Sequence, residues 1–386
     1  MTEENTVMKV LYIHIGTPKT GTTAIQAFCQ ENQKVLEKRG YCYPIFPYTY
    51  ADAIQRRNGH FLVGYLKKEN GDRDNEKEEQ IFREGMDRIY ALFETYHSVI
   101  LSDEYIWTIT RNKRTSLWKE LAEEAKQHNF QVKIIVYLRR QDEYLSSSWN
   151  QTVKVGTIKE CVYTWDKYLE NIPEIKQQDY AKKLDSIAAA LGKENVIVRR
   201  YERSGFFGGS IYADFLNAVG LELNDEYFIK RENRNGSLIG NTHEIKRVLN
   251  TLTLNREQNE FFRDVLLEFA QLSDEKYKSS VLSKDEAQKI IDEYKDGNER
   301  IAREYLHKND GMLFDENIKD LTKWQKDNPY MLDDMIRFTG MNTIFLLKEI
   351  EKMRNEQEKL KKEIQILKES QKKNLVKKLV QKVKSK

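Results

Sequence analysis

One short segment near the start of the chain limits the possible folds more than any other. Residues 9–16, with the letters KVLYIHIG, form a β-branched and aromatic run that is typical of a buried strand. The turn TPKTGTT follows, and residues 24–40 then show the apolar pattern of a helix that ends at Gly40. A strand, a glycine-containing turn and a helix in this order predict the opening of a parallel α/β sheet.

Three further apolar runs extend this pattern along the chain. They cover residues 98–102, 132–138 and 195–201, and amphipathic helices separate them. Their spacing predicts an α/β fold with a parallel sheet and helices on both faces. Residues 52–80 are polar and charged, and we interpret them as a long surface excursion near the mouth of the sheet.

After residue 224 the strand signal stops and helices dominate. We expect helices at residues 238–252, 256–272 and 284–306, the last with a capping box formed by Ser283 and Glu286. The sequence thus predicts three parts, which are a domain over residues 1–338, a coiled coil over 342–370 and a basic amphipathic tail over 371–386.

Composition excludes several classes of protein. With 386 residues, 39% of them hydrophobic and 32% charged, the chain is neither disordered in composition nor a membrane bundle. No apolar run approaches the roughly 20 residues that span a bilayer, and the first residues are too polar for a signal peptide, so we expect a cytoplasmic protein. The cysteines Cys29, Cys42 and Cys161 match neither a disulfide framework nor a zinc site, and we expect reduced thiols.

The formal net charge of +3 hides an uneven distribution. Residues 370–386 contain seven lysines and no acidic residue, so the rest of the chain is net acidic. A general nucleic-acid-binding protein would carry positive charge across its folded face, and we therefore expect no nucleic acid as a partner. Apolar residues at helical spacing among these lysines are typical of a helix on an anionic membrane surface at the inner face; a solvated helix end is an equal alternative.

A heptad pattern begins at Leu346. One seam position holds Ile350, Gln357 and Ile364, and the other holds Leu346, Met353, Leu360 and Leu367. In a parallel pair of such helices, Glu349, Glu356 and Glu363 face Arg354, Lys361 and Lys368 of the partner. The pattern favours a homo-oligomer formed through this coiled coil, with Gln357 setting the register. The alternative is a single amphipathic helix packed on the body of the protein.

The turn after the first strand has the features of a phosphate-binding loop. It lies between a strand and a helix, where backbone N–H groups and the positive end of the helix dipole converge on an anion. It departs from the Walker pattern because Thr22 stands in the place of the lysine, and Lys19 lies inside the loop instead. We expect a single phosphate held by N–H groups and two hydroxyls, with Lys19 reaching a neighbouring bridging oxygen.

PKTGTT after a hydrophobic strand resembles the 5′-phosphosulfate-binding loop of sulfotransferases that use 3′-phosphoadenosine 5′-phosphosulfate (PAPS). The resemblance implies PAPS binding by Thr17, Pro18, Lys19, Thr20, Gly21, Thr22 and Thr23. Arg139 and Ser147, eight positions apart after a strand, resemble the 3′-phosphate clamp of this family. Arg140 and Ser148 have the same spacing, so the register stays open by one residue. Tyr201, at the end of another strand, resembles an adenine-pocket residue, with a core tyrosine as the alternative.

Sulfuryl transfer requires a cation at the leaving oxygen and a base for the acceptor proton, and the family implies no metal. Lys19 is our candidate for the cation. Glu104, at the carboxyl end of a strand, is the favoured base; a helix-capping carboxylate is the alternative. His60 is an assisting or alternative base, against a reading as a surface histidine. Asp103 should point away from Glu104 if the chain is still extended there.

These features together predict a PAPS-dependent sulfotransferase. Its acceptor would carry a hydroxyl or amine, and we expect a glycan or glycolipid intermediate of polysaccharide biosynthesis, which Lys154 would help to contact. The basic tail motivates only the expected location at the inner membrane face. Two alternatives stay open. One is a P-loop kinase or NTPase with an aberrant Walker loop, and the other is a non-catalytic, membrane-associated coiled-coil scaffold.

Overall fold

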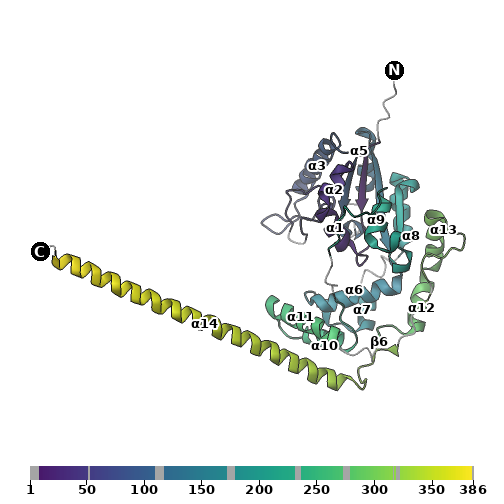
Figure 1. Cartoon of the computed structure of the whole chain (residues 1–386). Coiled ribbons are helices and arrows are strands. Elements are labelled where there is room, and N and C mark those ends of the chain that lie inside the picture. Colours follow the sequence, from purple (N-terminus) through teal and green to yellow (C-terminus); the bar gives the residue numbers. More distant parts are fainter. Residues whose placement is uncertain are drawn as a thin grey trace. The chain divides into compact units, whose positions relative to one another are not determined.

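The computed structural model describes residues 8–50, 53–108, 117–171, 179–230, 236–272, 279–315, 317–318 and 322–384 (Figure 1). Contacts within the chain divide it into two compact units. Unit 1 comprises Met1–Gln151, Tyr163–Asn235 and Ser280–Lys323, and unit 2 comprises Thr152–Val162, Gly236–Ser279 and Trp324–Lys386.

Unit 1 is built on a five-stranded sheet with the strand order β2-β3-β1-β4-β5. The strands are β1 (Val10–His14), β2 (Tyr41–Cys42), β3 (Ser98–Ser102), β4 (Gln131–Leu138) and β5 (Val196–Arg200). All four strand pairings are parallel, and Tyr12 in β1 is in register with Ile100 of β3 and Lys133 of β4. The predicted parallel sheet is confirmed; β2 was not predicted, because two residues are too short to show a period.

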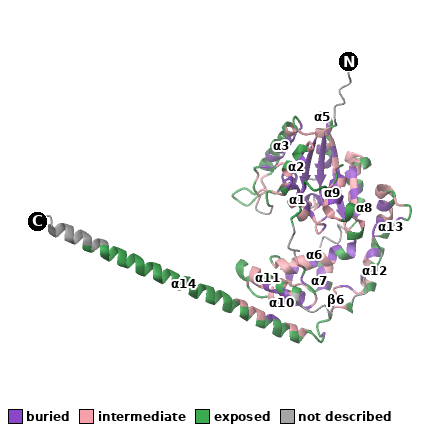
Figure 2. Cartoon of the chain, in the orientation of Figure 1, coloured by how far each residue is buried: buried purple, intermediate pink, exposed green. Residues whose placement is uncertain are grey.

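Helices cover both faces of this sheet, as the sequence predicted. Leu11 and Ile13 of β1 pack on one face and Val10 and Tyr12 on the other, because side chains alternate along a strand. The first face is covered by α3 (Asn75–Leu92), α5 (Leu117–Gln127), α8 (Tyr180–Leu191) and α13 (Lys295–Leu306), and the second by α1 (Thr22–Glu31), α2 (Gln33–Lys38) and α9 (Ile211–Ala218). Figure 2 shows the strands as the buried centre of the unit.

Two helices that the sequence predicted as continuous are interrupted. The expected helix over residues 24–40 breaks at Asn32, whose amide donates to the carbonyl of Phe228 at 2.8 Å and accepts from its N–H at 2.7 Å. The expected helix over 284–306 breaks at Tyr294 into α12 (Lys284–Glu293) and α13. The capping box that begins α12 is confirmed. A hydrophobic period alone does not reveal such breaks, since it continues across them.

Residues 52–80 are not a surface excursion throughout, and that expectation is wrong for the middle of the segment. Asn58 and the short 3-10 helix η1 (His60–Leu62) are buried. The Asn58 side chain donates to the Ile100 carbonyl at 3.0 Å and accepts from the Ser102 N–H at 2.8 Å. Polar residues here satisfy buried backbone groups, which their polarity alone does not reveal.

Unit 2 is helical. Its core contains Leu238, Ile245, Val265, Leu266 and Phe338, contributed in part by α10 (Asn241–Leu249), α11 (Arg256–Leu272) and α14 (Met331–Lys384). The remaining elements among the described residues are α6 (Gln141–Val155), α7 (Trp165–Asn171), β6 (Ser279–Ser280), β7 (Thr322–Lys323) and the 3-10 helices η2 (Glu104–Thr108), η3 (Lys159–Val162), η5 (Lys193–Asn195), η6 (Arg203–Gly205) and η7 (Phe207–Gly209).

The structure also bears on the expectations about the cysteines, membrane-spanning helices and the basic tail. The cysteines Cys29, Cys42 and Cys161 are free and buried, which confirms the expected thiols. In the described ranges, no helix combines the length and the apolar character that a bilayer crossing needs. The expected basic tail, residues 371–386, is helical to Lys384, but most of its side chains lie outside the described residues.

Candidate active site

Three neighbouring strands bring the candidate residues of unit 1 to one edge of the sheet. β1 lies between β3 and β4, and all three run parallel. The loop with Lys19 follows β1, Glu104 follows β3 by two residues, and Arg139 directly follows β4. From β1 the sheet extends outward in both directions, through β3 on one side and β4 on the other. Such a switch point in an open α/β sheet forms a crevice that commonly binds ligands.

The loop after β1 has an unusual backbone. Gly16, Lys19 and Gly21 have φ values of 56°, 71° and 75°, in the left-handed region. Glycine adopts this region readily, whereas lysine does so at a cost of about 1–3 kcal/mol, a strain that is concentrated at functional sites. A Cβ on Gly16 would lie 2.7 Å from Thr22 Oγ1, so the first glycine leaves room for that hydroxyl.

The first N–H groups of α1 face the loop without hydrogen-bond partners in the described chain. Ala24 and Ile25 are the first residues of the helix to donate, both to the Gly21 carbonyl, at 2.9 and 3.1 Å. The N–H groups of residues 20–23 form no hydrogen bond to any described residue. With the positive end of the helix dipole, they form a site suited to an anion.

The four threonines of the loop have different roles. Thr17 Oγ1 donates to the Tyr137 carbonyl at 3.1 Å, and Thr20 Oγ1 donates to the Thr17 carbonyl at 2.5 Å, so these two hydroxyls hold the loop itself together. Thr22 Oγ1 is buried and has no hydrogen-bond partner among the described residues. Thr23 is exposed. Thr22 is therefore the hydroxyl best placed to bind an anion at this site.

Arg139 reaches back to the loop. Its Nη1 donates to the Lys19 carbonyl at 3.2 Å, its Nε donates to Glu143 at 3.2 Å, and its guanidinium lies 5.6 Å from the centre of the Tyr201 ring. Tyr201 also borders the loop, because a Cβ on Gly21 would lie 3.1 Å from its ring. Lys19, Arg139 and Tyr201, which are far apart in sequence, thus meet at one place.

The two possible registers of the 3′-phosphate clamp differ in this structure. Arg140 is buried and donates to both Asp142 carboxylate oxygens, at 2.7 and 3.0 Å, and Ser148 accepts a hydrogen bond from Tyr168. Ser147 is half-buried, and its hydroxyl makes no hydrogen bond to a described residue. Arg139 also has partners, but its side chain is 22% exposed and its carboxylate partner Glu143 is exposed, whereas the Arg140 side chain is 9% exposed and pairs with buried Asp142. The greater accessibility of Arg139 and the unpartnered Ser147 hydroxyl favour Arg139 and Ser147 for a ligand.

Glu104 is held beside the loop by Gln26 of α1. Gln26 is buried, and its Nε2 donates to Glu104 Oε2 at 3.2 Å and to Ser102 Oγ at 3.3 Å. A Cβ on Gly16 would lie 3.5 Å from the Cβ of Glu104. Ser102 Oγ is also 2.9 Å from Nδ1 of His14, and burial lowers the pKa of His14 to about 3, so this imidazole is neutral. Gln26 was not predicted from the sequence, since a glutamine within a helix belongs to no motif.

Asp103 is fully buried, and its carboxylate is surrounded by Arg57, His60 and the Tyr105 N–H. Arg57 binds its carboxylate with two donors, at 2.7 and 3.1 Å, His60 Nδ1 lies 2.8 Å from Oδ2, and the Tyr105 N–H donates to Oδ1 at 2.6 Å. Burial lowers the pKa of Arg57, but the charge of Asp103 and its hydrogen bonds raise it by more, so the guanidinium is charged. A carboxylate only accepts hydrogen bonds, and the proton of a neutral His60 therefore lies on Nδ1.

The side chains of Asp103 and Glu104 do not point in opposite directions, as an extended chain would require. Glu104 begins η2, so the chain is no longer extended there, and Arg57 Nε lies 3.1 Å from Asp103 Oδ2 and 3.7 Å from Glu104 Oε2. The capping of η2 comes from Asp103 rather than from Glu104. His60 is 2% exposed, so the reading as a surface histidine is wrong.

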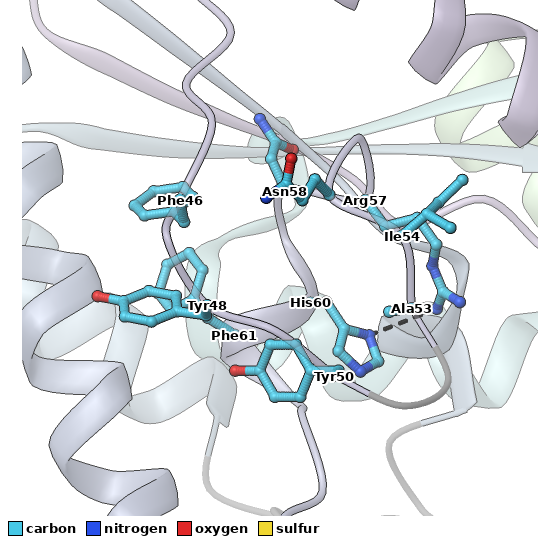
Figure 3. A pocket seen from close by; sticks show the side chains of 10 residues that line it. Phe46, Tyr48, Tyr50, Ala53, Ile54, Arg57, Asn58, His60 and Phe61 are labelled. Carbon is cyan, nitrogen blue, oxygen red and sulfur yellow. Dashed lines mark hydrogen bonds between the residues drawn. The ribbon is translucent and has the colours of Figure 1, made fainter. Parts of the chain in front are cut away.

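A small pocket with aromatic walls adjoins His60. Figure 3 shows Phe46, Tyr48 and Tyr50 around it, with His60 and Arg57 on its polar side. The Tyr50 ring lies edge-on to His60, with their centres 4.6 Å apart.

Lys154, which the sequence placed near the acceptor, belongs to unit 2, where its ammonium group donates to the Gly236 carbonyl at 3.3 Å. No group of His, Cys, Asp and Glu among the described residues is arranged to hold a metal ion.

Comparison with known proteins gives distant similarities. The sequence matches no protein-family model. An uncharacterized protein from Archaeoglobus fulgidus is 29% identical over 188 residues, which are 48% of this chain and 50% of that protein. The chain thus spans about half the length of the curated relative that it matches.

Two solved structures are similar in fold at low scores. A sulfotransferase from Alicyclobacillus acidocaldarius has a TM-score of 0.33 and 13% identity, covering 68% of this chain and 96% of that one. The sulfotransferase domain from the curacin biosynthetic pathway has a TM-score of 0.33 and 10% identity, covering 74% of this chain and 97% of that one.

Proposed function

We propose that the chain is a sulfotransferase that moves a sulfuryl group from PAPS to a hydroxyl or amine of an acceptor. The observation that carries the proposal is the meeting of the anion site after β1 with the Arg139 guanidinium, whose Nη1 lies 3.2 Å from the Lys19 carbonyl. A nucleotide with two separate phosphates needs two such groups close together. Tyr201 beside them offers a ring face for a base.

A phosphosulfate fits the loop better than a nucleoside triphosphate. Phosphoryl transfer in P-loop enzymes uses a lysine at the start of the helix and a magnesium ion. Thr22 occupies that position here, and Lys19 lies within the loop. The N–H groups of residues 20–23 and the Thr22 hydroxyl supply donors for one phosphate group. Magnesium-dependent ATP turnover that Lys19→Ala abolished would support the kinase alternative instead.

In the proposed reaction, the acceptor oxygen or nitrogen attacks sulfur while the bond from sulfur to the 5′-phosphate oxygen breaks. The electron pair of that bond stays on the phosphate, and the product nucleotide is 3′-phosphoadenosine 5′-phosphate (PAP). Lys19 would stabilise the negative charge that develops on the leaving oxygen. The acceptor proton would pass to Glu104, whose carboxylate is oriented by Gln26 next to the loop.

His60 is the second candidate for the base. Its Nδ1–H donates to Asp103, which directs Nε2 as the proton acceptor and holds the ring in one orientation. His60 borders the aromatic pocket, whose cavity volume of about 20 Å³ admits one small group, so an acceptor hydroxyl rather than a whole ring would enter it toward the imidazole. The half-buried rings of Tyr48 and Tyr50 favour an acceptor with apolar ring faces and polar edges, such as a saccharide. A glycan or glycolipid is accordingly our proposed acceptor, met in the cytoplasm or at the inner membrane face.

Nucleotide binding provides the direct test. We expect PAP to bind more tightly than 5′-AMP, because only PAP carries the 3′-phosphate. Arg139→Met should remove about ten- to a hundredfold of this preference, the value of a charged hydrogen bond, and leave 5′-AMP affinity nearly unchanged. Isothermal titration calorimetry with both nucleotides measures it. Arg300→Met, which breaks an exposed pair with Asp185, is the control. Equal affinity of the unmodified chain for PAP and 5′-AMP would remove the basis of the proposal.

Replacing Lys19 tests the proposed leaving-group cation. We expect Lys19→Met to lower the turnover of PAPS by about 10²–10³-fold, the usual loss when one charge-stabilising donor is removed. PAP affinity should change much less, because the N–H groups of the loop remain. Single-turnover assays and PAP titration separate the two quantities. Lys193→Met, which removes an exposed partner of Glu304, serves as the control. An equal loss in turnover and affinity would show that Lys19 only binds the nucleotide.

A further inference from the structure

The last helix, α14, has two different parts. It runs without a break from Met331 to Lys384 (Figure 1). Phe338 is buried in the core of unit 2, and Met341 and Phe345 pack against that core. From Leu346 onward the described helix residues are exposed, and Figure 2 shows this change along the helix. The core contacts of α14 thus end where the heptad pattern begins.

The seam of the heptad pattern is uncovered in the single chain. Its six apolar side chains are 44–66% exposed, and they are Leu346, Ile350, Met353, Leu360, Ile364 and Leu367. A contiguous apolar row of this kind on a helix marks an interaction surface, because leaving it in water forfeits the stabilisation that burial would supply.

The charges beside this seam are also unpaired. Glu349, Glu356 and Glu363 precede one seam position, and Arg354, Lys361 and Lys368 follow the other. None of these six side chains forms a salt bridge within the described part of the chain. In a parallel pair of helices each glutamate meets a basic residue of the other helix, whereas an antiparallel pair sets glutamate against glutamate and base against base.

We infer that a second copy of this chain covers the seam, and that the two α14 helices form a parallel, in-register coiled coil. The alternation of isoleucine and leucine at the two seam positions favours two strands. Gln357 is the polar exception within the seam. Aligned with its own copy, it can form an amide–amide hydrogen bond, whereas a shift of one heptad would bury it against an apolar layer. This inference does not depend on the proposed function.

Engineered cysteines test the orientation and register. Gln357→Cys and Ile364→Cys, each in the full chain, should give a covalent dimer under mild oxidation, because parallel in-register helices bring equivalent seam residues within disulfide range. Lys362→Cys, on the outer side of the helix, is the control and should stay monomeric on denaturing gels. The native thiols are buried and do not compete. Cross-linking at residue 357 without cross-linking at residue 364 would overturn the parallel register, since an antiparallel pair can centre on only one of them.

Reversing the charges beside the seam tests whether the partner of α14 is a second copy of this chain. Changing Glu349, Glu356 and Glu363 together to lysine should lower the dimer fraction at least tenfold, measured by light scattering, because every flank is then basic. The converse variant, with Arg354, Lys361 and Lys368 changed to glutamate, should lose self-association as well. Mixing the two variants should restore a dimer. A monomeric unmodified chain at tens of micromolar, or no recovery on mixing, would overturn the inference. PAP binding by unit 1 should be unchanged in all variants, which separates this result from the proposed function.

Discussion

Glu104→Gln is expected to reduce the turnover of sulfuryl transfer by about 10²–10⁴-fold, the usual contribution of a general base. Glutamine keeps the shape of the side chain and can still contact Gln26, but it does not accept the acceptor proton at neutral pH. PAP affinity should stay within about threefold, because in the proposed complex the loop and Arg139, not Glu104, hold the nucleotide. The experiment compares single-turnover rates and PAP titrations for the two proteins.

His60→Asn and Glu304→Gln complete this experiment. Glu304→Gln removes an exposed carboxylate that pairs with Lys193, so it should leave the rate unchanged. His60→Asn should lower the rate less than Glu104→Gln if histidine only assists. An unchanged rate in Glu104→Gln together with a large loss in His60→Asn would move the base to the imidazole that Asp103 orients.

Asp103→Asn is expected to lower the free energy of unfolding by about 3–5 kcal/mol, the usual result of removing one partner from a buried ion pair. The carboxylate is fully buried and accepts two hydrogen bonds from Arg57 and one from the Tyr105 N–H. Asparagine leaves the buried guanidinium with a neutral partner and adds a donor that faces other donors. Urea denaturation followed by tryptophan fluorescence measures the loss, since Trp107 and Trp118 lie in the same core.

A second aspartate in unit 1 offers a matched control. Asp185 also accepts two hydrogen bonds from one arginine, Arg300, at 2.8 and 2.7 Å, but its side chain is 50% exposed. Asp185→Asn should therefore cost only about 0–1 kcal/mol. If the two substitutions destabilised the protein equally, burial would not be the cause. A double-mutant cycle with Arg57→Met would then measure the pairwise energy directly.

Much of the fold followed from local pattern. Strand β3 and helix α11 have the bounds that the sequence predicted, and β4 begins one residue earlier. These elements are bounded by turn residues and by a clear apolar period, so short-range sequence is sufficient to locate them. The breaks at Asn32 and Tyr294 were missed, because the apolar period continues across them.

Part of the candidate site was predicted from the geometry of a parallel sheet rather than from local periodicity. Parallel strands end at one edge of a sheet, so residues just after adjacent strands must lie close together. Glu104 was proposed from such a position, whereas Lys19 and Arg139 were proposed from motifs that resemble a known loop and clamp; the structure brings Lys19 and Arg139 within hydrogen-bond distance. Their functional roles stay predictions. Gln26 and Arg57 were not predicted, since neither belongs to a motif and each matters only through the carboxylate that it contacts. The burial of His60 was missed because a polar segment reads as surface.

The amino-acid sequence by itself determined four of the five strands of the sheet, the glycine-containing turn after β1, the arginine after β4 and the heptad of the last helix, because each is encoded in the spacing of neighbouring residues. Only the tertiary structure decided which of two adjacent arginines faces the loop, which threonine hydroxyl is left for an anion, and which side chains hold Asp103 and Glu104. Those choices depend on contacts between segments up to 120 residues apart, as between Arg139 and Lys19, and local periodicity carries no information about them.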